Sequence, residues 1–292
     1  MGLLELFRRC PAHLCLLLAI HGLGAGAAWA GDDDDGDISK TATKTTNTAP
    51  NIYLDLSTAY ATVPANTILL GFRNIAALST SSSRNLTLNA PLTVDVTDRL
   101  TVVGGVSAST YSTAATGWQD MTLDSWFVGF TADVIEQRDW FPKVTVQSYL
   151  SRTVGVRTLG LNATSSSSAI ELNYALNEDE TRGVIGGIKY TDIFVDSRFV
   201  KIGPSLIGYA GGYYQWPNNW KVTGRFGVQS FDGASLVIPV KLPSFVQPIV
   251  KLDLERMDDN DNRLFGTSFE IIWAPKPIFQ FTLYTPIYAV RN

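Results

Sequence analysis

Carboxylate-rich segments are the first candidates for chemistry in this chain. The segment RMDDNDNRLFG, residues 256–266, places three aspartates and two asparagines in a row from Asp258 to Asn262. A calcium loop of the common type needs glycine at its sixth position and glutamate at its twelfth. Counted from Asp258, those positions hold Arg263 and Phe269. We therefore predict a structural turn and no metal site, with weak cation binding as the alternative.

A pair of carboxylates for acid–base chemistry is the second candidate. Asp253 and Glu255 are two residues apart, so a β-strand would point both to the same side. Glu270 falls on the next strand. The favoured interpretation is that these groups line a hydrated lumen beside Lys251 and Arg225, and a carboxylate-based enzyme is the alternative. We predict that the protein is not an enzyme and uses no cofactor.

The N-terminus has the features of a signal peptide. Arg8 and Arg9 precede a short apolar core, and Ala28-Trp29-Ala30 fits a signal-peptidase site. The core is shorter than the roughly 20 apolar residues of a spanning helix. We therefore predict that residues 1–30 are a signal peptide cleaved after Ala30, rather than an uncleaved anchor.

Cleavage there would remove every cysteine and histidine of the chain, which are Cys10, Cys15, His13 and His21. The mature protein would then lack a thiol nucleophile, an imidazole base, the common zinc ligands and a Ser-His-Asp triad. Loss of two arginines and one glutamate changes the formal net charge from −4 to −5. An acidic chain argues against a nucleic-acid partner.

Composition divides the remainder of the chain into three parts. Residues 31–50 are acidic and then threonine-rich, with few apolar residues to bury, so we predict disorder. Residues 51–65 are predicted to form either an extra strand or a plug inside a lumen. Residues 66–292 are predicted to form one β-barrel domain.

Alternation with period 2 is the dominant pattern after residue 51. In IVKLDLERM, residues 249–257, Leu252 and Leu254 alternate with Asp253 and Glu255. Successive strand side chains point to opposite faces, so one face is apolar and the other is charged. The pattern recurs and predicts about twelve strands, most of them near the 9–11 residues of a tilted transmembrane strand. The predicted ranges are 67–74, 85–95, 100–110, 121–134, 142–153, 167–177, 182–192, 203–216, 220–231, 245–256, 264–273 and 277–289.

Three features favour a transmembrane antiparallel barrel over a soluble sandwich or lipocalin-like barrel, which also alternates. The strands are long, and charged residues make up only 17% of the chain. The apolar residues are numerous enough to coat the outside of a barrel, and no helical pattern is available to cover a second core. Aromatic residues gather at strand ends, as in interfacial girdles. They are Trp140, Phe141, Trp216, Trp220 and Tyr288.

Four short polar turns are predicted to lie on one rim of the barrel, because even numbers of strands separate them. They span residues 95–105, 176–187, 215–227 and 256–266. Short turns of outer-membrane barrels lie on the periplasmic side. We therefore predict that both termini are periplasmic.

The polar faces of the predicted strands supply the candidates for a lumen lining. Charges of both signs do not define a strong anion or cation filter, and the tyrosines suit small polar or aromatic solutes. The candidates are Arg73, Asp95, Asp133, Glu171, Lys189, Arg225, Lys251, Asp253, Glu255, Glu270, Tyr149, Tyr209 and Tyr213.

Two segments, YATVPANTILLGF (residues 60–72) and APLTVDVTDRLTVVGG (residues 90–105), resemble a family of Gram-negative outer-membrane barrels. This family is the MetA-pathway of phenol degradation group of transporters. Asn66 stands where the family has glycine, and Val96 replaces the leucine of a Leu-Thr-Asp-Arg-Leu turn. The resemblance implies uptake of hydrophobic or aromatic compounds.

These patterns together predict an all-β protein, a transmembrane antiparallel β-barrel of about twelve strands in a Gram-negative outer membrane. The expected function is a passive, porin-like passage for small solutes, with a non-conducting structural or adhesive barrel as the alternative. The expected partners are the lipid bilayer and a small-molecule solute. The oligomeric state stays open.

Overall fold

The structure is a computed structural model that describes most of the chain after residue 50. The described residues are 51–65, 67–69, 77–79, 81–154, 162–197, 199–235, 241–258, 263–273 and 276–290. The predicted signal peptide and the predicted disordered segment, residues 1–50, lie outside them. No helix in the described part of the chain is long and apolar enough to cross a membrane.

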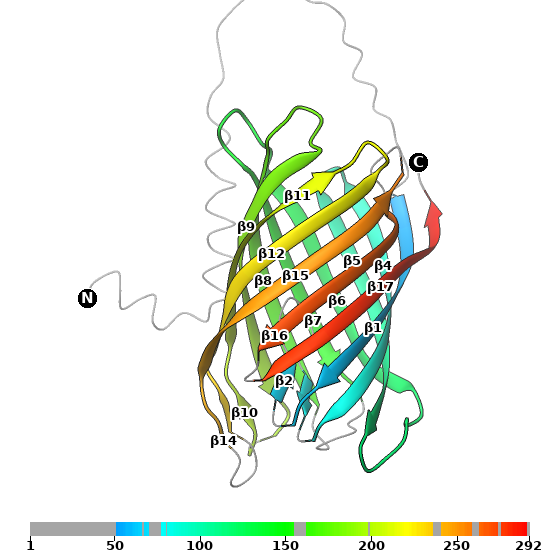
Figure 1. The fold of residues 1–292 in the computed structure, drawn as a ribbon, viewed down its shortest axis with the longest axis vertical. Coiled ribbons are helices and arrows are strands. Elements are labelled where there is room, and N and C mark those ends of the chain that lie inside the picture. The colour runs from blue at the N-terminus through cyan, green and yellow to red at the C-terminus, as the bar shows by residue number, and fades with distance from the viewer. Residues whose placement is uncertain are drawn as a thin grey trace, which may run out of the picture. The chain divides into compact units, whose positions relative to one another are not determined.

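Twelve antiparallel strands close into a barrel, as predicted (Figure 1). Around the ring the order is β1, β17, β16, β15, β12, β11, β9, β8, β7, β6, β5 and β4, which pairs with β1 again. Closure pairs the backbone groups of every wall strand on both sides, which a lipid environment demands. The bounds are β1 Asn51–Val63, β4 Ser83–Thr97, β5 Leu100–Thr113, β6 Thr122–Ile135, β7 Lys143–Thr153, β8 Ala163–Ala175, β9 Arg182–Val195, β11 Ser205–Gln215, β12 Trp220–Phe231, β15 Phe245–Met257, β16 Arg263–Trp273 and β17 Pro277–Val290.

The closing strand of the barrel is β1, which pairs with β17 on one side and β4 on the other. Its pairing with β17 runs from Ile52 opposite Val290 to Thr62 opposite Phe279. Of the predicted segment 51–65, residues 51–63 therefore form a wall strand, and the barrel begins at Asn51 rather than at residue 66.

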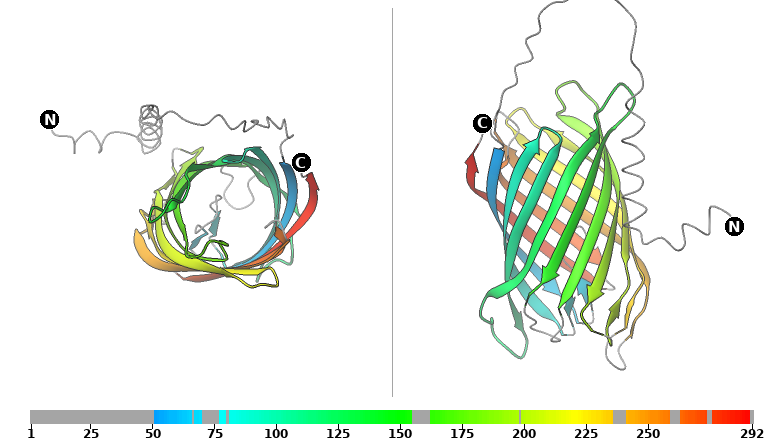
Figure 2. Two further views of the ribbon diagram at one scale, coloured as in Figure 1. Left: turned by 90° about the horizontal axis from the view of Figure 1, so that it is seen from above. Right: turned by 180° about the vertical axis from the view of Figure 1, so that it is seen from behind.

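The strand predicted at residues 67–74 is not part of the barrel wall, because β1 already fills the place between β17 and β4. Its first residues form β2 (Thr67–Leu69), which pairs with β3 (Ala77–Ser79) in a separate two-stranded sheet. Residues 70–74 lie outside the described residues. Figure 2, viewed along the barrel, draws this hairpin within the ring of wall strands.

The two ends of the barrel differ in their connections. One end carries the connections 98–99, 136–142, 176–181, 216–219 and 258–262, together with the start of β1 and the end of β17. We call it the turn rim, and it is at the top of Figure 1. All four turns that were predicted to share a rim lie there.

The opposite end, which we call the loop rim, carries mostly longer connections. They are 64–82, 114–121, 154–162, 196–204, 232–244 and the short 274–276. A small three-stranded sheet of β10 (Lys201–Ile202), β13 (Ala234–Ser235) and β14 (Lys241–Leu242) lies in these connections.

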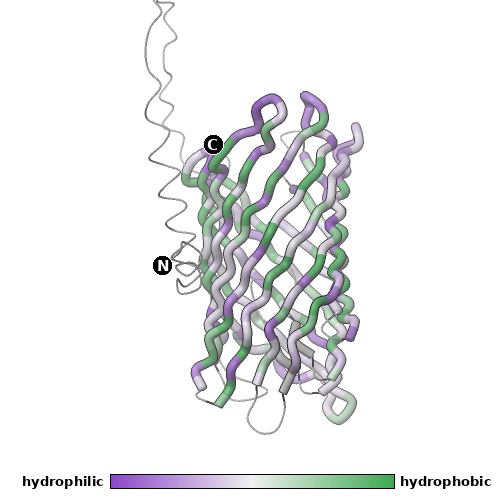
Figure 3. Tube along the Cα trace, turned by 90° about the vertical axis from the view of Figure 1, so that its left-hand side faces the viewer, coloured by the Kyte–Doolittle hydropathy of each residue, from purple (hydrophilic) through white to green (hydrophobic). Residues whose placement is uncertain are grey.

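The outer face of the barrel is apolar and exposed. Along the strands, hydrophobic and hydrophilic residues alternate (Figure 3). The outward positions include Ile188, Phe226 and Val246, whose exposed fractions are 60%, 63% and 69%. A soluble protein would leave such a surface in water, whereas a membrane barrel covers it with lipid.

The inner face near the loop rim contains a tightly packed apolar cluster. Ile249, Ile272 and Ile278 come from three adjacent strands, face the interior and are 0% exposed. They form one buried cluster with Ala61, Val63 and Ile207. Buried polar side chains, among them Gln229 and Gln280, lie on the same inner face.

Candidate functional site

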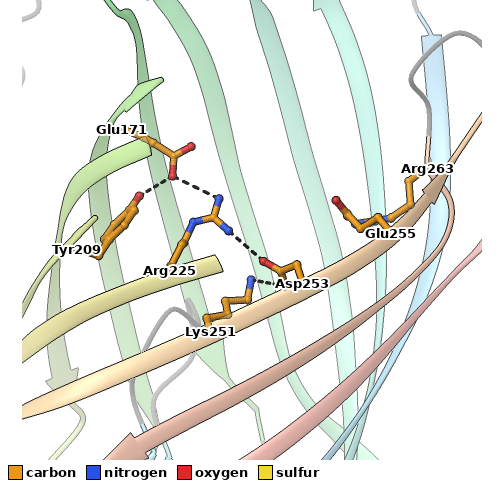
Figure 4. Close-up of polar contacts among 7 residues, drawn as sticks. All are labelled: Glu171, Tyr209, Arg225, Lys251, Asp253, Glu255 and Arg263. Atoms are coloured by element: carbon orange, nitrogen blue, oxygen red, sulfur yellow. Dashed lines mark hydrogen bonds and ion pairs between the residues drawn. The ribbon is translucent and has the colours of Figure 1, made fainter. Parts of the chain in front are cut away.

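A network of charged side chains lies inside the barrel, near the middle of β12 and β15 (Figure 4). Arg225 on β12 is at its centre. One guanidinium nitrogen, Nη1, donates to Asp253 Oδ2 at 2.9 Å, and the other, Nη2, lies 3.5 Å from Glu171 Oε2. Asp253 Oδ1 also forms an ion pair with Lys251 Nζ at 3.2 Å. The Tyr209 hydroxyl donates to Glu171 Oε2 at 2.6 Å.

Period-2 geometry brings these groups together. Lys251 and Asp253 are two residues apart on β15 and face the same side. Arg225 stands directly opposite Lys251 on the paired strand, so its guanidinium can reach along β15 to Asp253. Burial of these side chains is partial, 11% exposed for Asp253 and 20% for Arg225. Mutual neutralisation makes a charged interior tolerable.

A second network of opposite charges lies beside the first. Arg263 on β16 donates to Glu255 Oε1 at 3.2 Å and to Asp55 Oδ2 at 2.9 Å. The same guanidinium lies 4.6 Å from the centre of the Tyr284 ring. Four strands, β15, β16, β17 and β1, therefore meet at one arginine.

Both networks border a cavity of about 380 Å³ on the inner side of the wall. This volume is within the range of small-molecule sites, about 300–1,000 Å³. Twelve described residues line it, from β8 to β17. They are Glu171, Asn173, Ile185, Tyr213, Lys221, Thr223, Arg225, Lys251, Asp253, Glu255, Arg263 and Tyr284.

Each of the three predicted lumen tyrosines stands directly opposite a glycine on the neighbouring strand. The pairs are Tyr149 with Gly129, Tyr209 with Gly187, and Tyr213 with Gly183. A Cβ atom added at Gly129 would lie 2.3 Å from the Tyr149 ring, and one at Gly183 would lie 2.5 Å from the Tyr213 ring. The glycines therefore let the rings lie flat against the wall instead of crossing the lumen.

Four other predicted candidates, Asp95, Asp133, Lys189 and Glu270, are not among the described residues that line the cavity. Asp133 accepts from Thr145 and pairs with Lys143 at 2.8 Å. Asp95 accepts from Thr101 at 2.9 Å. Lys189 and Glu270 are buried, at 6% and 3% exposed, and Arg73 lies outside the described residues.

The ion pairs and strand register also bear on the alternative hypothesis of a carboxylate-based enzyme. Asp253 is held between Arg225 and Lys251, and Glu270 stands opposite Lys251 in the β15–β16 register. A cation thus lies beside each carboxylate of the proposed pair. Such compensation suits a charged wall better than an acid and a base held at different protonation states.

Three charged residues of the site were not among the predicted candidates. Lys221 shares the face of Arg225 and could have been found from its parity alone. Arg263 directly follows a turn, and alternation there does not predict whether a side chain faces the lumen or the lipid. Asp55 could be placed only once residues 51–63 were known to be a wall strand.

The aspartate-rich turn connects β15 to β16 on the turn rim. Residues 259–262 lie outside the described residues. Among the residues that are described, no group of three or more His, Cys, Asp or Glu could hold a metal ion.

Comparisons with known proteins identify the fold. No family model and no curated protein matches the sequence. Among solved structures, the COG4313 outer membrane channel from Pseudomonas putida F1 is similar with a TM-score of 0.53 and 9% identity, over 86% of this chain and 100% of that chain. The chain therefore folds as an outer-membrane β-barrel, and the predicted resemblance is confirmed at the level of the fold.

Two further structures are similar at lower scores. The translocator domain of the autotransporter NalP from Neisseria meningitidis has a TM-score of 0.44 and 10% identity, over 85% of this chain and 90% of that chain. The toluene transporter TodX from P. putida has a TM-score of 0.33 and 13% identity, over 80% and 87%.

Proposed function

We propose that the protein is a passive channel for small solutes in a Gram-negative outer membrane. The observation that carries this proposal is the cavity inside the barrel, lined by compensated charges and by tyrosines. Paired cations and carboxylates supply a hydrated, polar wall without a large net charge. This wall suits solutes that carry polar groups, and the Tyr213 and Tyr284 rings suit solutes with an apolar or aromatic part.

The apolar cluster toward the loop rim supports a narrow passage rather than a wide pore. A solute entering past Ile249, Ile272 and Ile278 would meet apolar side chains first and the charged cavity afterwards. The resemblance to the phenol-degradation family and the similarity to an outer membrane channel support transport as the general role.

We further propose that the turn rim faces the periplasm. The start of β1 and the end of β17 lie on this rim, so both would be periplasmic. The short turns on this rim support the assignment. Single cysteines test it, because the mature chain is predicted to have none. A membrane-impermeant maleimide should label Thr116→Cys on the loop rim in intact cells, and Asp179→Cys on the turn rim only after permeabilisation. The reverse pattern would overturn the orientation.

Liposome swelling tests the channel itself. Proteoliposomes containing the mature protein should swell in isotonic solutions of small solutes, faster for arabinose than for a trisaccharide such as raffinose. Heat-denatured protein is the control. Swelling rates equal to those of the control for every solute would favour the non-conducting barrel instead.

A further inference from the structure

We infer that the cavity contains a binding site for small carboxylates, formed by Lys221 and the ring of Tyr213. This inference rests on the proposed channel function and names the class of solute that the cavity would hold. It comes from the distribution of ion pairs among the residues that line the cavity.

Among the described residues, four cations and three carboxylates line the cavity, and one of these seven groups makes no ion pair with another described residue. Arg225 and Lys251 pair with Asp253, and Arg225 also reaches Glu171. Arg263 pairs with Glu255. Every carboxylate of the cavity is therefore already neutralised by an arginine or lysine.

Lys221 is the remaining cation, and it makes no ion pair with any residue that the structure describes. Its Nζ atom lies 4.7 Å from the centre of the Tyr213 ring. Glu255 stands directly opposite Lys221 on β15, yet its carboxylate is turned to Arg263. The ammonium thus keeps its hydrogen-bond donors for a solute, while the cation–π contact holds it in place.

The difference between the Lys221 ammonium, which forms no ion pair with a described residue, and the paired carboxylates decides which solutes the cavity favours. An entering carboxylate meets an ammonium group that needs no ion pair broken before it can bind. An entering ammonium solute would have to displace an arginine or lysine from a carboxylate. The ring faces of Tyr213 and Tyr284, with Ile185 beside them, can cover an apolar body next to the charged group. A small aromatic or aliphatic monocarboxylate therefore fits better than an amine.

Titration calorimetry on the detergent-solubilised mature protein tests this site without requiring transport. The probes are benzoate, acetate and benzylamine. Benzoate should bind more tightly than acetate, because its ring can contact the tyrosines, and more tightly than benzylamine. Lys221→Gln should weaken benzoate binding about tenfold, as expected for the loss of a charged hydrogen bond, and Lys221→Arg should retain most of the affinity.

Lys201→Gln is the matched control, because it removes the same charge from an exposed side chain of β10 on the loop rim. It should leave benzoate binding unchanged. Equal benzoate binding by wild type and Lys221→Gln, or equal binding of benzylamine and benzoate, would overturn the site. Lys221-dependent benzoate binding by a protein that shows no conductance would support the site and contradict the channel. Conductance without such binding would contradict the site alone.

Discussion

Arg263 on β16 donates to Asp55 on β1 at 2.9 Å, although β17 lies between these two strands in the ring. The two residues are 208 positions apart in the chain. The guanidinium crosses β17 over the Tyr284 ring. One side chain therefore ties the first strand of the barrel to the last three, across the seam where the barrel closes.

Loss of this contact should weaken barrel closure. Arg263→Gln removes the donor from both Asp55 and Glu255, whose side chains are about one fifth exposed. We expect a loss of about 1–3 kcal/mol in the free energy of unfolding, in the range for charged hydrogen bonds. Urea unfolding in lipid vesicles, followed by tryptophan fluorescence, measures it.

The control for this variant is Arg138→Gln, which removes an exposed charge from the 136–142 turn. Its unfolding free energy should match that of the wild type. Equal stability of Arg263→Gln and Arg138→Gln would show that the contact across the seam contributes nothing to closure.

The Tyr149–Gly129 pair predicts an effect of a single methyl group. Gly129→Ala places Cβ 2.3 Å from the Tyr149 ring and 2.6 Å from the Ser148 carbonyl oxygen, which is backbone and cannot rotate away. We expect destabilisation of about 1–3 kcal/mol from overpacking, measured by the same unfolding assay.

Gly208→Ala is a matched control in another wall strand, since nothing lies within 4 Å of its added Cβ. It should stay within about 0.5 kcal/mol of the wild type, as surface changes usually do. A Gly129→Ala protein as stable as Gly208→Ala would mean that the tyrosine ring does not lie against the wall.

The exposed outer face predicts a cost for charge in the middle of a strand. Ile188 is near the centre of β9 and is 60% exposed. Ile188→Arg should destabilise the protein in bilayers by about 2–4 kcal/mol, the cost of arginine near the membrane midplane. Trp140→Arg, in the 136–142 turn, should cost no more than about 1 kcal/mol. Equal costs for the two variants would argue against lipid contact at Ile188.

The central position of Arg225 predicts a change in ion selectivity. Arg225→Gln removes the cation shared by Glu171 and Asp253, so the cavity loses one positive charge beside two carboxylates. We expect the ratio of potassium to chloride permeability to rise by about twofold. Reversal potentials under a salt gradient measure it. Arg84→Gln, an exposed residue near the loop rim end of β4, should leave the ratio unchanged.

Alternation in the sequence predicted which side chains of the wall strands face the lumen, because lipid-facing positions are apolar and lumen-facing positions are polar. Lys251, Asp253 and Glu255 alternate with leucines, and all three face the cavity. The same pattern could not show that Ile249 and Ile272 face inward. The residues that flank Ile249 and Ile272 on the outer face are apolar as well, so period 2 carries no contrast at these two positions.

Pairing between distant segments was beyond what the sequence could predict. The apolar run at 67–74 is as strand-like as the segment that forms β1, and alternation does not say which one pairs with β17. With residues 67–74 as the first wall strand, the sequence does not predict whether the Asp55 side chain faces the lumen or the lipid. The Arg263–Asp55 contact, which depends on that closure, has no local signal.

Single-channel recording in planar bilayers is the most direct test of the central claim that solutes pass through the barrel. The mature protein, without residues 1–30, should produce discrete conductance steps in potassium chloride, and Arg225→Gln should shift their selectivity. Folded protein that inserts into the bilayer but gives no steps at any voltage would contradict a channel and favour a closed barrel.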